Sequence, residues 1–197
     1  EIEEFMDVCR RRGADYVVME VSSHALFLSR VDSLDFNAAI FTNLTQDHLD
    51  LHETMEAYRD AKLLLFQNLA RGEGNFSVIN ADDEYAPDFL AAFPEAVVSY
   101  GIKKPADVAA KEVQVSLKGT RFTAVYKDAV LTISMKLIGL FSVYNALAAT
   151  AFALREGVDP ADIVKALSKV EGVPGRFEQV QCGQDFTAKV GWQKFCS

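Results

Sequence analysis

Short apolar runs that end abruptly in polar side chains constrain this fold more than any other feature of the sequence. Residues 16–19 run directly into Glu20, and residues 36–41 run into Thr42 and Asn43. Runs of this length are typical of buried strands, and strands that alternate with helices predict a parallel sheet. Because ligands bind outside the carboxyl ends of the strands in such sheets, the sequence predicts functional side chains at this edge.

The rest of the chain continues the alternation of helices and strands. Apolar residues at helical spacing predict helices from the start of the chain to Gly13, from Thr54 to about residue 69, and over 141–155 and 159–169. Strands are predicted over 75–79 and 97–100, with residues 80–83 as the turn and cap before a further helix.

The middle of the chain changes period. Apolar and polar residues alternate in steps of two over residues 108–117, 122–126 and 130–135, with turns at 118–119 and 127–128. We read these segments as a small antiparallel sheet appended to the main one. The predicted fold class is therefore α/β: a mainly parallel sheet flanked by helices, with a small antiparallel β-subdomain.

Composition limits the class of function. The chain has 197 residues, 50% of them hydrophobic, and a formal net charge of −8. That charge argues against a nucleic-acid-binding protein, which needs a concentrated basic face. Its three cysteines are too few and too scattered for a disulfide framework, and no apolar run is long enough to span a membrane. We therefore expect a cytoplasmic protein that acts on small molecules. The chain opens mid-helix without a methionine, which indicates a fragment.

Two polar clusters carry the candidate chemistry. Glu20 alone would be an ordinary carboxylate at the end of a strand, but Ser22, Ser23 and His24 add hydroxyls and an imidazole beside it. Such a set suits an anionic or metal-bearing ligand. In the second cluster, His48 lies between two aspartates, as a metal ligand held by carboxylates would.

Other candidate residues have ordinary explanations when each is taken alone. The helical periodicity alone predicts that Lys62 is an ordinary lysine whose side chain extends to solvent. Arg30 would be a surface arginine, Asn145 a residue at a helix start, and Arg176 a hinge-loop arginine paired with a nearby glutamate. His52 shares the loop of the second cluster, and we assign it to loop structure.

The amino-acid sequences of these segments resemble those of the central, ATP-binding domain of the Mur ligases. The resemblance rests on Met-Glu-Val-Ser-Ser-His-Ala-Leu at residues 19–26, on Thr-Asn-Leu-Thr-Gln-Asp-His-Leu-Asp at residues 42–50, and on the helix that carries Lys62. It runs from about residue 1 to residue 184. Within the family, these motifs are most similar to those of the enzymes that add the third amino acid to UDP-N-acetylmuramoyl-dipeptide.

The resemblance implies roles for individual residues. Glu20 and His48 would bind magnesium ions, and Lys62 would be carbamylated by carbon dioxide, which turns a cation into an anion with two oxygens. Ser22 and Arg30 would bind the UDP-sugar peptide. Two departures from the family pattern lie nearby, where Leu28 stands for a usual glutamine and Ser142 for a usual asparagine.

The nucleotide site is implied in the same way. Asn145 would lie near the adenine of ATP, and Arg176 would reach the ATP phosphates. The implied reaction is addition of diaminopimelate or lysine to UDP-N-acetylmuramoyl-L-Ala-D-Glu in peptidoglycan synthesis. It would use ATP and Mg²⁺ and pass through an acyl phosphate, in the bacterial cytoplasm. The oligomeric state stays open, with a monomer as the default.

The expected domain organisation is that of a piece of such a ligase. Residues 1–178 would form the central domain with an antiparallel insert at about 106–137, and 179–197 would begin the next domain with a divergent tail. The sequence contains no Gly-x-x-x-x-Gly-Lys-Ser/Thr phosphate loop, so we expect the fragment alone to be inactive. The alternatives are a catalytically dead nucleotide- or UDP-sugar-binding module, a pseudogene product, or a ligase related to folylpolyglutamate synthase or cyanophycin synthetase.

Overall fold

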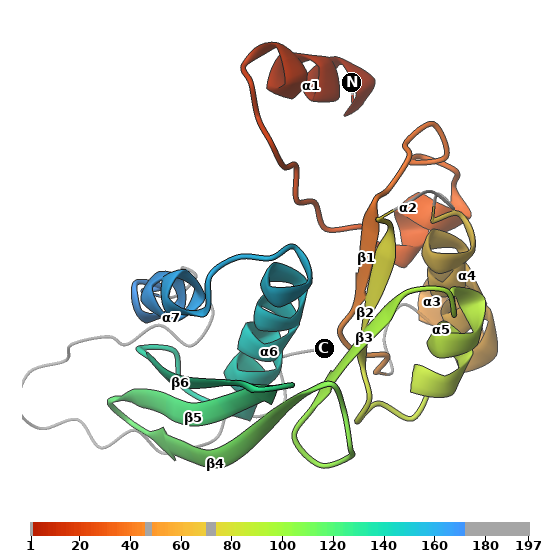
Figure 1. Ribbon diagram of the computed structural model, residues 1–197. Helices are drawn as coiled ribbons and strands as arrows, with labels where there is room; N and C mark the ends of the chain where they lie inside the picture. The colour runs from red at the N-terminus through yellow and green to blue at the C-terminus, as the bar shows by residue number, and fades with distance from the viewer. Residues whose placement is uncertain (1, 46–48, 70–73, 172–197) are drawn as a thin grey trace, which may run out of the picture. The chain divides into compact units, whose positions relative to one another are not determined.

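The computed structural model describes residues 2–45, 49–69 and 74–171 (Figure 1). It divides into two compact units. The first comprises the chain up to Ser77 together with Tyr85–Val97, and the second comprises Val78–Glu84 together with the chain from Val98 onward.

The first unit is mainly helical around a short stretch of sheet. Its described elements are α1 (Ile2–Arg11), α2 (Ser23–Phe27), β1 (Ala38–Phe41), α3 (Leu49–His52), α4 (Met55–Gln67), the start of β2 (Phe76–Asn80) and α5 (Ala86–Ala92). Helix α4 begins where the sequence predicts, because the Thr54 hydroxyl accepts a hydrogen bond from the N–H of Ala57 at 3.1 Å. Helices α2, α3 and α5 all pack against α4.

The core of the first unit centres on three aromatic rings. Phe89 of α5 is fully buried and stacks on Phe41 of β1, with ring centroids 3.7 Å apart. Phe66 of α4 meets the same ring edge-on at 5.0 Å. These contacts join a strand and two helices, so they fix the position of α4 in this unit.

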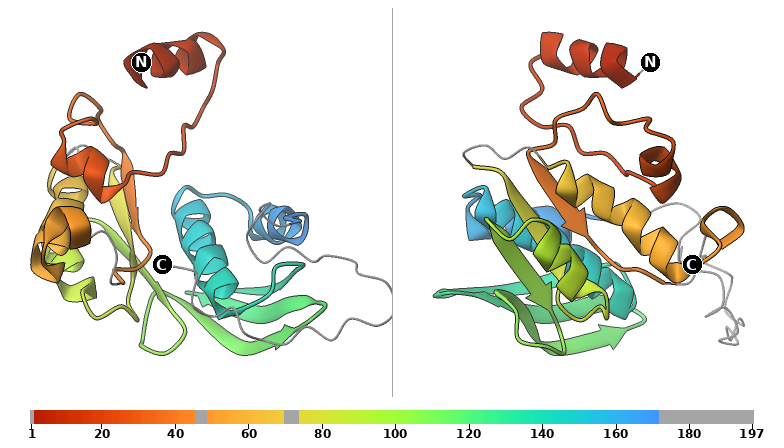
Figure 2. Two further views of the ribbon diagram at one scale, coloured as in Figure 1. Left: turned by 180° about the vertical axis from the view of Figure 1, so that it is seen from behind. Right: turned by 90° about the vertical axis from the view of Figure 1, so that its right-hand side faces the viewer.

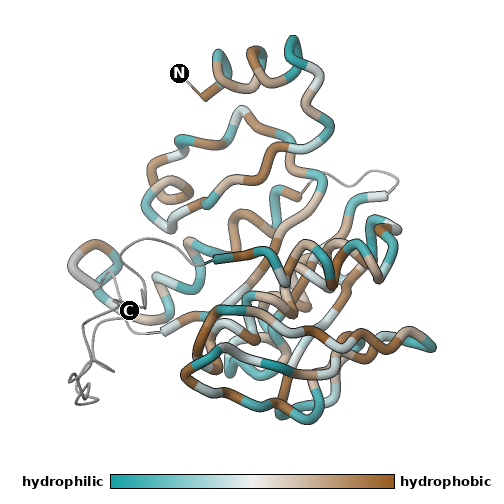
Figure 3. The backbone as a smooth tube through the Cα atoms, turned by 90° about the vertical axis from the view of Figure 1, so that its left-hand side faces the viewer, coloured by the Kyte–Doolittle hydropathy of each residue, from teal (hydrophilic) through white to brown (hydrophobic). Residues whose placement is uncertain are grey.

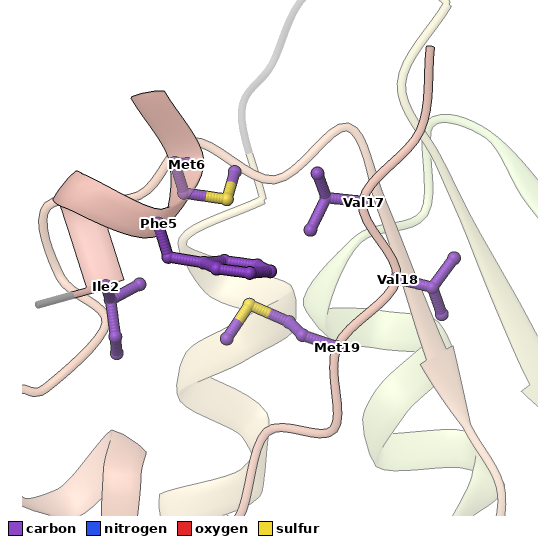
Figure 4. Close-up of a pocket in the computed structure, with 6 residues that line it drawn as sticks. All are labelled: Ile2, Phe5, Met6, Val17, Val18 and Met19. Atoms are coloured by element: carbon purple, nitrogen blue, oxygen red, sulfur yellow. The ribbon is translucent and has the colours of Figure 1, made fainter. Parts of the chain in front are cut away.

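The predicted strand over residues 16–19 is wrong. This segment has no regular secondary structure, and Val18 is 84% exposed. Figure 4 shows Val17 and Met19 beside Phe5 of α1, where these side chains help to line an apolar pocket of about 250 Å³. A strand is held by the ladder to its neighbour, and within the described residues this segment pairs with no strand. Val17 and Met19 therefore face α1 instead, while Val18 stays exposed to solvent.

The second unit is a sheet covered by two helices. Its elements are the end of β2, β3 (Val97–Gly101), β4 (Val108–Ser116), β5 (Gly119–Tyr126), β6 (Ala129–Met135), α6 (Leu140–Arg155) and α7 (Pro160–Ser168). Figure 2 shows α6 and α7 on the same face of strands β4 to β6. The apolar residues of β5 and β6 that are buried on that face are Phe122, Ala124, Leu131, Ile133 and Met135.

The sheet confirms the predicted fold class. Its hydrogen-bonded order is β1-β2-β3-β4-β5-β6, and β2 and β3 contribute residues to both units. The N–H of Ser77 donates to the carbonyl of Ala96, and the N–H of Ala81 donates to the carbonyl of Tyr100. The partner number rises along both strands together, which shows that β2 and β3 are parallel. Strands β3 and β4 are also parallel, whereas β4–β5 and β5–β6 are antiparallel. The antiparallel strands therefore continue the main sheet through β4.

The later elements lie close to their predicted positions, but β5 begins at Gly119 whereas the sequence predicts a strand only from residue 122. The turn between β4 and β5 needs glycine at Gly119, where φ is +134° and a Cβ would collide with the carbonyl oxygen of Met135. Helix α7 begins at the predicted Asp159-Pro160, and the Asp159 carboxylate accepts a hydrogen bond from the N–H of Ala161 at 2.8 Å. Hydrophobic and hydrophilic stretches alternate along the backbone (Figure 3). In the described part of the chain, no helix has the length and hydropathy to cross a membrane.

Candidate functional site

Three of the predicted site residues flank the short helix α2 in the first unit. Glu20 is exposed in the segment that leads into the helix. Ser22 is the N-cap, and its hydroxyl accepts a hydrogen bond from the N–H of Ala25 at 3.2 Å. Arg30 follows the helix and is exposed, with its own N–H donating to the carbonyl of Ala25 at 2.8 Å. A carboxylate, a hydroxyl and a guanidinium are therefore presented to solvent within eleven residues of chain.

Lys62 lies on α4, one helical turn after Tyr58. Its ammonium nitrogen is 5.3 Å from the centroid of the Tyr58 ring, a cation–π contact. Lys62 is half-buried, whereas Tyr58 is 5% exposed. The side chain is therefore held against the helix surface rather than extended into solvent.

A buried histidine connects these two groups, and sequence reasoning missed it. His52 is 5% exposed, and its Nε2 lies 2.9 Å from the hydroxyl oxygen of Ser23 on α2. Its ring stacks on Tyr58 with centroids 5.3 Å apart. The sequence alone assigns His52 only to loop structure. No local signal indicates the contact, because its partner lies 29 residues away in the sequence.

His48 and Arg176 lie outside the described residues, so their predicted roles stay predictions. The described residues hold no group of three histidine, cysteine, aspartate or glutamate side chains that could bind a metal. Mg²⁺ prefers oxygen ligands, and Glu20 offers an exposed carboxylate. An unmodified lysine is a cation and does not suit such a site, so Lys62 fits Mg²⁺ only as the carbamate.

The predicted nucleotide residue Asn145 belongs to the second unit. It is exposed in the second turn of α6. Ser142, which departs from the family pattern, is 2% exposed, and its hydroxyl donates to the carbonyl of Ile138 at 3.0 Å. This serine holds the start of the helix, so its side chain faces the protein rather than a ligand.

Asp82 ties the loop after β3 to α6 in the second unit. Its carboxylate accepts hydrogen bonds from the N–H groups of Ile102, Lys103 and Lys104 and from the hydroxyl of Tyr144, the last at 2.8 Å. Burial opposes ionisation of this group, but the hydrogen bonds outweigh it and hold the pKa of Asp82 below its usual range. Stability from this carboxylate is therefore present at neutral pH and is lost as the pH falls below the usual carboxyl range.

The predicted helix cap at residues 80–83 is thereby corrected. The turn forms, but the N-cap of α5 is Tyr85, which makes no side-chain capping bond. Asp82 is drawn instead to three N–H groups of the loop after β3. A Cβ on Gly101 would approach the Asp82 carboxylate to 3.2 Å, so glycine leaves room for it. Only the tertiary structure brings this loop within reach of Asp82.

Replacing Tyr144 with phenylalanine should reduce the loss of folding stability at alkaline pH. Burial and the neighbouring Asp82 raise the pKa of Tyr144 to about 12, above its ordinary value of 10.0. Folding thus favours the neutral phenol, so its contribution is complete below pH 10 and is lost as the pH rises towards 12. Urea unfolding between these pH values should show a smaller decline for Tyr144→Phe than for the wild type. Parallel declines would contradict this assignment.

A mainly parallel sheet with an antiparallel extension and covering helices is an architecture shared with solved Mur ligases. The chain belongs to the Mur ligase family: the family description "Mur ligase middle domain" matches residues 1–153. The predicted family and fold class are confirmed.

Individual relatives agree with this assignment. The chain is 57% identical over 192 residues to the UDP-N-acetylmuramoyl-L-alanyl-D-glutamate–2,6-diaminopimelate ligase of Syntrophomonas wolfei, a match that covers 98% of this chain and 39% of that protein. A solved structure of a ligase with the same name is 31% identical with a TM-score of 0.77, over 87% of this chain and 36% of that one.

A more distant solved structure shows how widely the fold is shared. The MurF ligase of Thermotoga maritima, solved in complex with ADP, is 20% identical with a TM-score of 0.62 over 75% of this chain and 34% of that one. The chain thus spans about two fifths of the length of a curated relative that it matches, 39% in the case of the Syntrophomonas protein.

Proposed function

We propose that the protein carrying this chain is an ATP-dependent ligase that joins 2,6-diaminopimelate to UDP-N-acetylmuramoyl-L-alanyl-D-glutamate in the bacterial cytoplasm. The observation that carries the proposal is the 57% identity over 192 residues to a ligase of that name. The sequence alone left diaminopimelate and lysine open. The name of this relative favours diaminopimelate.

The first unit would supply the groups around the reacting carboxylate. Ser22 and Arg30 would bind the UDP-sugar dipeptide, since a guanidinium can present a planar fork to a phosphate or carboxylate. Glu20, His48 and carbamylated Lys62 would hold magnesium, which would offset the charge of the ATP phosphates. The exposed positions of Glu20, Ser22 and Arg30 support this assignment, because a large anionic substrate can reach them from solvent.

The second unit and the end of the chain would bind the nucleotide. Asn145 is exposed on α6, so its amide can both donate to and accept from the edge of an adenine. Arg176 would contact the phosphates. The MurF ligase of Thermotoga maritima was solved in complex with ADP, which agrees with a nucleotide site in proteins of this fold.

The proposed reaction has two steps. The γ-phosphoryl group of ATP passes to an oxygen of the dipeptide carboxylate, which releases ADP and leaves an acyl phosphate. The amine of diaminopimelate then attacks the carbonyl carbon and loses a proton, while the bond to the phosphate oxygen breaks. Positioning and charge neutralisation account for catalysis of this type, so no side chain of this chain needs to act as a nucleophile.

The test is to assay the intact gene product with ATP, Mg²⁺, UDP-N-acetylmuramoyl-L-Ala-D-Glu and an amino acid. We expect phosphate release and tripeptide formation with diaminopimelate, and at least ~10-fold slower turnover with lysine, since buried polar groups of the site would be left unpaired. Binding of the UDP-dipeptide without any ATP turnover would instead identify a binding module, and the ligase proposal would be wrong.

A further inference from the structure

His52 is a buried polar side chain that the proposed reaction does not use. Only 5% of its surface is exposed, and it ends the four-residue helix α3. Burying a polar group without a hydrogen bond is costly, and here Nε2 meets the Ser23 hydroxyl at 2.9 Å. Ser23 is itself only 1% exposed. Both partners of this hydrogen bond are therefore withdrawn from water, which strengthens it.

The imidazole touches two helices at once. Its edge is bonded to Ser23 of α2, and its ring meets Phe27 of the same helix edge-on at 5.7 Å. Its face stacks on Tyr58 of α4, with an angle of 20° between the rings. One side chain thus contacts both α2 and α4, which also pack directly against each other.

Helix α2 depends on such contacts for its position. It is five residues long, from Ser23 to Phe27, and helices this short are not stable by themselves in water. Apart from the N-cap bond of Ser22, the geometry of the helix must come from tertiary packing. Ser22 directly precedes α2 and Glu20 lies three residues before the helix, so the contacts that hold α2 also anchor the end of the segment that carries them.

On the other side, the imidazole supports the helix that carries Lys62. Tyr58 lies between the two, stacked on His52 at 5.3 Å and with the Lys62 nitrogen 5.3 Å from its ring centroid. Residues four apart share one face of a helix, so a shift of Tyr58 would move the lysine with it. The contacts therefore run without a break from Ser23 through His52 and Tyr58 to Lys62.

We infer that His52 is a positioning residue that holds the Glu20–Ser22 segment at a set distance from Lys62. This inference rests on the proposed function, in which Glu20 and carbamylated Lys62 would both hold magnesium. Residues that orient metal ligands typically change metal affinity or activity by about 10–100-fold when they are replaced. The role of His52 should therefore be visible in the magnesium dependence of the enzyme.

Two variants remove the bond from opposite sides. His52→Phe keeps a buried ring on Tyr58 but loses the hydrogen bond, and Ser23→Ala removes the hydroxyl with little change in volume. Both variants are assayed in the full-length protein. Each should lower kcat and raise the magnesium concentration that gives the half-maximal rate. The two changes multiplied together should amount to about 10-fold or more. Because both variants break one interaction, the double variant should be little worse than the more severe single one.

Two further variants separate positioning from simple loss of stability. His52→Gln places an amide near the site of Nε2, and it should recover most of the magnesium affinity lost in His52→Phe. Phe122→Leu is the control, because Phe122 is 1% exposed on β5 of the second unit and belongs to neither α2 nor α4. It should lower Tm without changing the magnesium dependence.

The outcomes are distinguishable. If the wild type shows ligase activity but His52→Phe and Ser23→Ala behave like Phe122→Leu, with lower Tm and unchanged magnesium dependence, His52 contributes only to packing and the inference is wrong. If the wild-type protein turns over no ATP with either amino acid, the proposed ligase function itself is wrong and the positioning role fails with it.

Discussion

Replacing Lys62 with alanine should lower kcat of the intact ligase by at least ~100-fold, because a group proposed to bind the metal directly should matter no less than one that only orients a ligand. The fold should tolerate the change. The Lys62 nitrogen makes a cation–π contact with Tyr58, and such a contact contributes about 1 kcal/mol or less at a partly exposed site. Steady-state kinetics and a thermal melt of the same preparation measure both quantities.

Lys62→Arg is the control that separates the carbamate from the cation. Arginine keeps the positive charge over Tyr58 but does not form the carbamate, so it should be as inactive as alanine. The wild-type enzyme should lose activity in buffer depleted of carbon dioxide and regain it with bicarbonate, whereas neither variant should respond. An active Lys62→Arg variant would show that the cation is the working form and would remove Lys62 from the proposed metal site.

Phe89→Ala should have the largest effect on stability, a loss of about 3–5 kcal/mol in the free energy of unfolding. Phe89 is fully buried, with Phe41 stacked on it at 3.7 Å and Phe66 edge-on at 5.0 Å. Removing the ring leaves a cavity between a strand and two helices, and both aromatic contacts are lost. Urea unfolding followed by far-UV circular dichroism measures the change.

Leu90→Ala provides the comparison within the same helix. Leu90 is adjacent to Phe89 in α5 but is 37% exposed, so its truncation should cost under about 1 kcal/mol. Equal losses for the two variants would mean that α5 does not pack through Phe89. The aromatic core of the first unit would then need another explanation.

Much of the fold could be predicted because it depends on local patterns. Period-two alternation placed the strands β4 to β6, and Thr54 and Asp159 marked helix starts that the structure confirms. The strand over residues 16–19 was wrong for a non-local reason. Its apolar residues satisfied the pattern, but a strand also needs hydrogen bonds to a neighbouring strand, and Val17 and Met19 face α1 instead.

The residues of the candidate site also divide into those that the sequence predicts and those that only the tertiary structure reveals. The roles of Glu20, Ser22, Arg30 and Lys62 were predicted from short sequence motifs, and they stay predictions. The contacts of His52 and Asp82 could not be predicted, since their partners lie 29 residues away for Ser23 and 62 for Tyr144. Asp82 in particular had a plausible local role as a helix cap, and tertiary packing overrode it.

By itself, the sequence determined the α/β class, the family and the residue types available for catalysis. Periodicity, helix capping and sequence motifs can each be recognised within a few consecutive residues. Only the tertiary structure decided that a buried imidazole joins α2 to the lysine-bearing helix and that the Asp82 carboxylate holds the loop after β3. Both depend on hydrogen-bonding groups that meet only after the chain has folded. Their partners are far apart in the sequence, so no local pattern encodes these contacts.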